Sequence, residues 1–125
     1  MGRAEDQGRI FEWDDDKREL NVRNHSVDFG VAMLIWRDQN LQERLDFREY
    51  FDHHGNPETR WQAVGEPILQ TEAEIAVAIG QYRGILFVVY TDRESPVDGT
   101  DVRHIISARL ATREETRRYI LRTFE

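Results

Sequence analysis

A run of six apolar residues, Ile85 to Tyr90, limits the fold of this chain more than any other segment. A continuous apolar strand is typical of a sheet centre that is covered on both faces, whereas a strand with one solvated face alternates apolar and polar residues. We therefore expect a central strand here, with other elements packed on both sides of it. A chain of 125 residues has room for one such core.

The segments around this run predict further strands. A short apolar and polar alternation begins at Ile10, and an aromatic-rich stretch runs from Leu45 to the turn residues at His53–Pro57. The other expected strands cover residues 59–64, 74–79 and 102–108. Residues 74–79 place three β-branched side chains on one strand face, and Gly80 to Gly84 is typical of a hairpin turn. We expect residues 92–101 to form a polar loop.

Three helices are expected from capping residues. Asp14 and Asp28 can each cap a helix, the first running to about Asn24 and the second to about Arg37. The second has a buried stripe at i, i+3, i+4 and i+7, formed by Phe29, Ala32, Met33 and Trp36. A capping-box pattern at Thr112–Glu115 begins the last helix, which ends near Arg122. The sequence thus predicts one α+β domain over residues 10–125, with a small antiparallel sheet, two N-terminal helices and a C-terminal helix, after a flexible tail at residues 1–9.

Composition limits the function classes. The chain has no cysteine, which excludes disulfides and thiolate metal sites, and it has no apolar stretch suited to a signal peptide or a membrane span, so we expect a cytoplasmic protein. The formal charge of −7 argues against a generally basic nucleic-acid binder. However, six arginines and two glutamates between Arg103 and Arg122 give that end a charge of +4. This end is either a solvated arginine-rich helix or an anion-binding surface.

The first helix carries Lys17, Asn21 and His25 at four-residue spacing, so the three side chains point one way if the helix persists to His25. A cation, an amide and an imidazole on one stripe could bind a phosphate and move a proton. The alternative is a solvated face that ends in a histidine near the helix C-terminus.

The last strand offers a second set of candidates. Regular alternation puts Arg103, Ser107 and Arg109 on one face and His104 on the other. Arg109 could bind a phosphate through its planar guanidinium, or it could pair with a glutamate of the following helix. We expect no metal site, because the adjacent His53 and His54 would face opposite ways on a strand, and no cofactor, because the chain lacks a glycine-rich phosphate loop.

Several landmarks taken in order resemble one family. They are Phe11–Asp14, Lys17, Asn21, His25, Val27, Phe29, Arg60–Trp61, Leu86–Thr91, Ile105–Arg109, Ala111–Thr112, Glu115 and Tyr119. This pattern is similar to the BrnT family, the ribonuclease toxins of bacterial type II toxin–antitoxin systems. The resemblance implies a RelE-like fold, growth inhibition by RNA cleavage, and neutralisation by a BrnA-like ribbon-helix-helix antitoxin. It also implies either a homodimer or a 2:2 toxin–antitoxin complex.

Metal-independent cleavage of RNA needs a base for the ribose 2′-OH, an acid for the leaving oxygen and cations around the phosphate. With the resemblance in mind, we expect His25 to transfer the proton, Lys17, Arg60 and Arg109 to bind the phosphate, and Tyr119 to assist. Expected substrate-binding residues are Trp61, which either stacks on a base or is buried, together with Arg103, His104 and Ser107.

The chain departs from the family at three points: Ser26 replaces a usual glycine, His104 replaces a usual arginine, and the stretch from Gly65 to Leu86 is longer than usual. A different class of function therefore stays open, namely a non-catalytic protein of this fold that binds only a partner protein.

Overall fold

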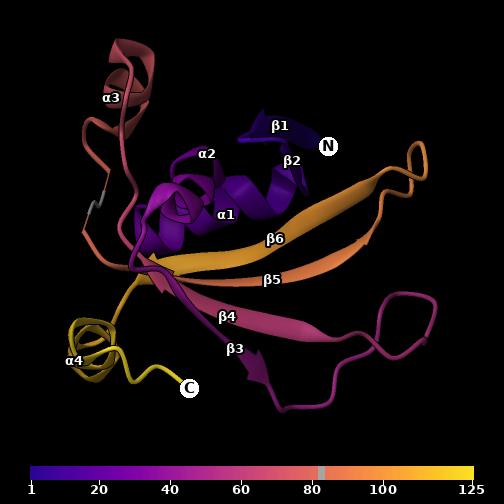
Figure 1. Cartoon of the computed structure of the whole chain (residues 1–125). Helices are drawn as coiled ribbons and strands as arrows, with labels where there is room; N and C mark the ends of the chain where they lie inside the picture. The colour runs from indigo at the N-terminus through magenta and orange to yellow at the C-terminus, as the bar shows by residue number, and fades with distance from the viewer. Residues whose placement is uncertain (82–83) are drawn as a thin grey trace.

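The computed structural model describes residues 1–81 and 84–125 and has an α+β architecture built on one six-stranded sheet (Figure 1). The strands are β1 (Gly2–Asp6), β2 (Arg9–Trp13), β3 (Gln42–Asp46), β4 (Arg60–Gly65), β5 (Leu86–Glu94) and β6 (Asp101–Leu110). Their order is β1-β2-β6-β5-β4-β3. The sheet is mixed rather than antiparallel as expected, because β2 joins β6 in parallel while the other strand pairs are antiparallel.

The helices lie on both sides of this sheet. They are α1 (Asp15–His25), α2 (Phe29–Ala32), the 3₁₀ helix η1 (Met33–Arg37), α3 (Glu72–Ala78) and α4 (Arg113–Leu121). The predicted caps are confirmed, since Asp14, Asp28 and Thr112 each accept hydrogen bonds from backbone N–H groups in the first turn of α1, α2 and α4. Figure 1 shows α1 and α2 on the upper side of the sheet and α4 below one end of it.

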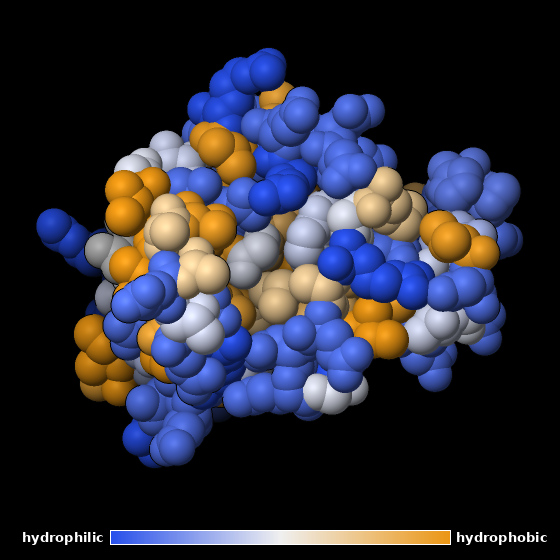
Figure 2. Space-filling view, turned by 90° about the horizontal axis from the view of Figure 1, so that it is seen from above, coloured by the Kyte–Doolittle hydropathy of each residue, from blue (hydrophilic) through white to orange (hydrophobic). Residues whose placement is uncertain are grey.

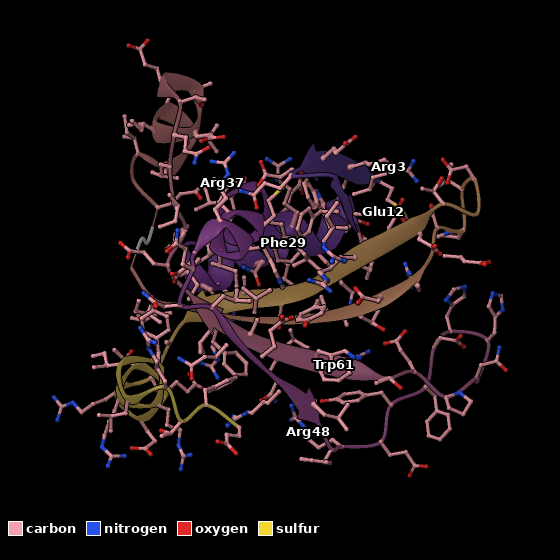
Figure 3. The ribbon with its side chains drawn as sticks, in the orientation of Figure 1. Arg3, Glu12, Phe29, Arg37, Arg48 and Trp61 are labelled. Atoms are coloured by element: carbon pink, nitrogen blue, oxygen red, sulfur yellow. The ribbon has the colours of Figure 1, made fainter. Side chains whose placement is uncertain are left out.

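Strand β5 confirms the expectation drawn from the apolar run. Leu86, Val88 and Tyr90 belong to the core beneath α2 and η1, whereas Phe87 and Val89 belong to a second core with residues of α4 and the C-terminal segment. Figure 3 shows Phe29 between α2 and the sheet. Both faces of β5 are therefore buried, and this is why the strand has no polar side of its own.

Residues 1–9 form a strand and a tight turn instead of the expected flexible tail. Strand β1 pairs with β2 through five residue pairs, and Gln7 and Gly8 both adopt positive φ at the turn. Ion pairs hold β1 in place, because Arg3 contacts Glu12 of β2 and Arg37 of η1 contacts Asp6. The polar composition of this segment reflects these partners rather than disorder.

Residues 74–79 are mostly helical, and the strand predicted there is wrong. Thr71 and Glu74 form a reciprocal capping box that starts α3, and this local signal outweighs the spacing of β-branched residues. Ile75, Val77 and Ile79 are 45%, 49% and 72% exposed, so they form no sheet face. Helix α3 stands away from the sheet (Figure 1), and Figure 2 shows hydrophobic surface on that side of the molecule. The turn predicted at Gly80–Gly84 includes residues 82 and 83, which lie outside the described residues.

Candidate active site

A groove of about 510 Å³ lies on the sheet face opposite α2 and η1, at the end away from α4. Its basic and imidazole side chains come from four elements of the chain: Lys17 from α1, Arg60 from β4, Arg93 from β5, and His104 from β6. His53, from the turn after β3, also lines it. Two of the three cations expected to bind phosphate, Lys17 and Arg60, are therefore brought together.

A β-bulge in β6 decides which residues share this face. Val89 pairs with Ser107 but Tyr90 pairs with Ile105, so Ile106 is an extra residue that has no partner on β5. The bulge reverses the alternation beyond it. As a result, Ser107 and Arg109 lie on the face of His104, and Arg103 lies on the opposite face, whereas regular alternation placed Arg103 with Ser107 and Arg109.

His104 is the most buried titratable group of the groove, with 8% of its surface exposed. Burial, reinforced by the positive charge of Arg93, lowers the pKa of His104 to about 4, so the ring is neutral at neutral pH. An Arg93 guanidinium nitrogen lies 3.1 Å from Nδ1 of His104. Because a guanidinium can only donate, Nδ1 accepts and the ring proton resides on Nε2.

Lys17 and Arg60 differ in whether a carboxylate neutralises the charge of the side chain. Within the described residues Lys17 forms no ion pair, and it lies in the first turn of α1 just after the Asp14 cap. Arg60 donates to Glu58 over 2.8 Å and stacks on the Tyr50 ring at 4.0 Å, so its guanidinium is fixed in direction. Unlike Arg60, Lys17 could therefore bind a phosphate without displacing a carboxylate.

Carboxylates balance the cations of the groove. Asp14, Asp52 and Glu58 line it along with the three cationic side chains, so the groove has no strong positive excess from these six groups. The groove is therefore not a strongly basic surface. Binding of an anion here would depend on the fixed positions of the cations rather than on the total charge.

Arg109 and Tyr119 lie at the α4 end and serve as packing contacts there. Arg109 donates to both carboxylate oxygens of Glu115, over 2.7 and 2.9 Å, and stacks on Phe87 at 4.1 Å. Tyr119 donates to Asp38 over 2.6 Å, and burial together with this bond raises the pKa of its hydroxyl. Neither residue lines the groove.

Two other candidates lie on the opposite face of the sheet. Arg103 is buried, donates to Asp92 over 2.8 and 2.9 Å, and stacks on Tyr90 at 4.4 Å. Trp61 is adjacent to Arg60 on β4, so the two side chains point to opposite faces. Trp61 is exposed, with 36% of its surface accessible, so the expectation that it is buried is wrong; Figure 3 shows its position on β4.

The stripe of Lys17, Asn21 and His25 divides into three different environments. Asn21 is buried, donates to the carbonyl oxygens of Val27 and Ala108, and accepts from the N–H of Ala108. His25 is exposed at the end of α1 and does not line the groove. Ser26 adopts φ 56° as the C-cap, the left-handed conformation for which the family resemblance implied glycine.

The groove residues that were not singled out as site residues from the sequence include Phe51, His53 and Arg93. Arg93 was assigned to a polar loop, but β5 continues through Glu94 and carries it onto the groove face. His53 and His54 were weighed only as metal ligands, yet both are exposed in a turn, with ring centroids 4.0 Å apart. The described part of the chain contains no cluster of three or more residues suited to holding a metal ion.

No helix among the described residues has the length and apolar character needed to cross a membrane. The chain matches no family model, and a search of curated proteins found no relative.

Proposed function

We propose that this chain is a metal-independent endoribonuclease, the toxin of a type II toxin–antitoxin pair with a RelE-like fold, as its resemblance to the BrnT family implies. The observation that carries the catalytic part is the convergence of Lys17, Arg60, Arg93 and His104 in one groove. A neutral imidazole next to fixed cations can accept a proton at a phosphodiester, and a phosphate bound at Arg93 would offset the positive charge that helps to hold the pKa of His104 low.

The proposed reaction is attack of the ribose 2′-oxygen on the adjacent phosphorus, with loss of the 5′-oxygen of the next nucleotide. The 2′-OH gives its proton to His104, and Lys17 and Arg60 stabilise the charge that develops on the phosphate oxygens. In the free protein Nδ1 of His104 accepts from Arg93, so a phosphate that binds Arg93 releases Nδ1 as the base. His53, on the wall of the same groove, donates the proton to the leaving oxygen.

The proposed assignment moves proton transfer from His25 to His104, because His25 lies outside the groove. Purified protein with a defined RNA and a chelator present should give 2′,3′-cyclic phosphate ends. His104→Gln should lower the cleavage rate about a hundredfold or more, while His25→Gln, which changes an exposed histidine, should leave the rate unchanged. Melting temperatures of both variants show whether each one folds.

The partner expected from the resemblance is a BrnA-like ribbon-helix-helix antitoxin, encoded by a neighbouring reading frame. Co-expression with that partner should abolish growth inhibition and RNA cleavage. If the wild-type protein binds the partner but cleaves no RNA, the chain is instead the non-catalytic, partner-binding protein. The near balance of charge in the groove is the structural feature consistent with that outcome.

A further inference from the structure

The groove contains an exposed aromatic side chain that the proposed chemistry does not use. Phe51 lines the groove and is 54% exposed, although it belongs to one of the residue types that bury most apolar area. Among the described residues its ring stacks on no other aromatic ring. A flat apolar surface is thus open to solvent beside three cations and two imidazoles.

The backbone holds Phe51 in place although its side chain is exposed. Phe51 forms an isolated antiparallel bridge with Pro57, and the N–H of Glu58 donates to the carbonyl of Tyr50 over 2.9 Å. Between them, the Asp52 carboxylate accepts from the N–H groups of His54 and Asn56, each over 2.9 Å. An aromatic side chain on such an ordered turn loses little entropy on binding a flat ligand.

The groove also extends beyond the space needed for one phosphate. A second hollow of about 450 Å³ shares five lining residues with it, namely Asp52, His53, Glu58, Arg93 and Pro96. The two hollows therefore adjoin each other at the 51–58 turn and β5. A chain of several nucleotides could lie along them.

We propose that Phe51 is the base-stacking platform of this groove and that its ligand is single-stranded RNA, with one base on the Phe51 ring while the backbone phosphate binds Lys17 and Arg60. A base in a duplex has both faces covered by its neighbours, so only an unpaired base can stack on this ring. Trp61, the aromatic expected to stack, lies on the other face of the sheet. This inference names the substrate class and rests on the proposed function.

The test uses a 2′-O-methyl RNA oligomer, which has no free 2′-OH and is not cleaved, with affinity measured by fluorescence anisotropy. Phe51→Ala should weaken binding about five- to a hundredfold, the range for losing one stacked base. Phe51→Trp should retain affinity within about twofold, since the platform is kept. The matched control is Phe47→Ala, because Phe47 is 89% exposed and lies outside both hollows, so its loss should not change binding.

A series of oligomers with one abasic position each identifies the stacked base. In the wild-type protein one abasic position should cause the same loss as Phe51→Ala, and in the Phe51→Ala protein that position should cause no further loss. A duplex of the same sequence should bind equally to both proteins.

The outcomes separate this inference from the proposed function. If RNA binding depends on Lys17 and Arg60 but not on Phe51, the stacking platform is overturned and the nuclease proposal remains. If no oligomer binds at all, both are overturned. If Phe51→Ala weakens only the complex with the antitoxin, Phe51 is part of a protein interface and the stacking inference fails.

Discussion

At the scale of single residues, the environment of each histidine decides what it can do. His25 is exposed at a helix end, whereas His104 is buried and receives a hydrogen bond from Arg93. The sequence shows both as histidines near expected phosphate ligands. Burial, which the sequence pattern does not specify for a strand residue of this type, lowers the pKa of His104 and keeps its ring neutral at neutral pH.

The lowered pKa of His104 predicts a pH dependence of stability. Between pH 6.5 and about 4 the unfolded chain takes up a proton that the folded ring resists, so wild-type stability falls as pH falls through that window. Relative to His104→Gln, which has no such proton, the wild-type protein should lose at most about 3 kcal/mol. Urea unfolding of both proteins at several pH values measures this difference. If the difference in the free energy of unfolding did not change with pH, the folded ring would take up a proton as readily as the unfolded one.

Arg109 is predicted to contribute to stability rather than to catalysis. Its two hydrogen bonds to Glu115 join β6 to α4, so Arg109→Ala should reduce the free energy of unfolding by about 1 kcal/mol. RNA cleavage should be unchanged because Arg109 lies outside the groove. A suitable control is Arg117→Ala, since Arg117 makes only an exposed 3.4 Å contact with Glu114. If Arg109→Ala instead left stability unchanged and abolished cleavage, Arg109 would be a phosphate-binding residue, as expected from the sequence.

At the scale of elements, α1 replaces a strand neighbour along part of β6. Strand β2 pairs with β6 only at Arg103 and His104, and the buried amide of Asn21 bonds both the N–H and the carbonyl of Ala108 farther along. The asparagine therefore satisfies an otherwise open sheet edge and places Lys17, one turn earlier, at the groove.

This arrangement predicts a large effect of Asn21→Ala. The change leaves buried backbone groups of Ala108 and Val27 without their partner, so it should cost about 2 to 4 kcal/mol of stability. Asn24→Ala provides the control, because Asn24 is exposed on the same helix and should tolerate the change. Thermal or urea unfolding gives both values. A small loss for Asn21→Ala would mean that water can replace the amide at this edge.

Helix α3 shows why residues 74–79 were misassigned. Glu74 accepts from Arg37 through both carboxylate oxygens, each over 2.8 Å, in addition to forming the capping box with Thr71. Figure 3 shows Arg37 beneath α3. The Arg37 guanidinium and the backbone bonds hold the pKa of Glu74 down to about 2, so this attachment persists under ordinary conditions. A single capping residue and one distant arginine together outweigh β propensity.

At the scale of the whole molecule, the formal charge of −7 limits how RNA can bind. Attraction must come from a few fixed cations in the groove rather than from a basic surface. The arginine-rich end expected to bind anions is partly neutralised, since Arg109, Arg117 and Arg118 all pair with glutamates of α4.

The salt dependence of RNA affinity tests whether only a few cations contact the phosphates. With about three phosphate contacts, the plot of log affinity against log salt concentration should have a slope near −2, since each contact on a single strand contributes about −0.7. Lys17→Ala should make the slope shallower by about 0.7. The measurement is oligomer binding across a salt series. A slope twice as steep would indicate that the arginines of α4 also contact RNA.

The sequence by itself determined the elements that local rules control. The buried strand at Ile85–Tyr90, the caps at Asp14, Asp28 and Thr112, and the α+β class all follow from patterns within a few residues, because capping and side-chain period are local properties. It also singled out Lys17 and Arg60 as phosphate ligands and His104 as a substrate-binding residue.

Only the tertiary structure decided which of these residues meet. The bulge at Ile106 moved Arg103 away from Ser107 and Arg109, and the extension of β5 to Glu94 brought Arg93 against His104. Both depend on strand register, which is fixed by packing between segments distant in the chain. For the same reason the sequence indicated Lys17, Arg60 and His104 as residues suited to phosphate chemistry, while the fold alone brought these three together with Arg93 and Phe51 in one groove.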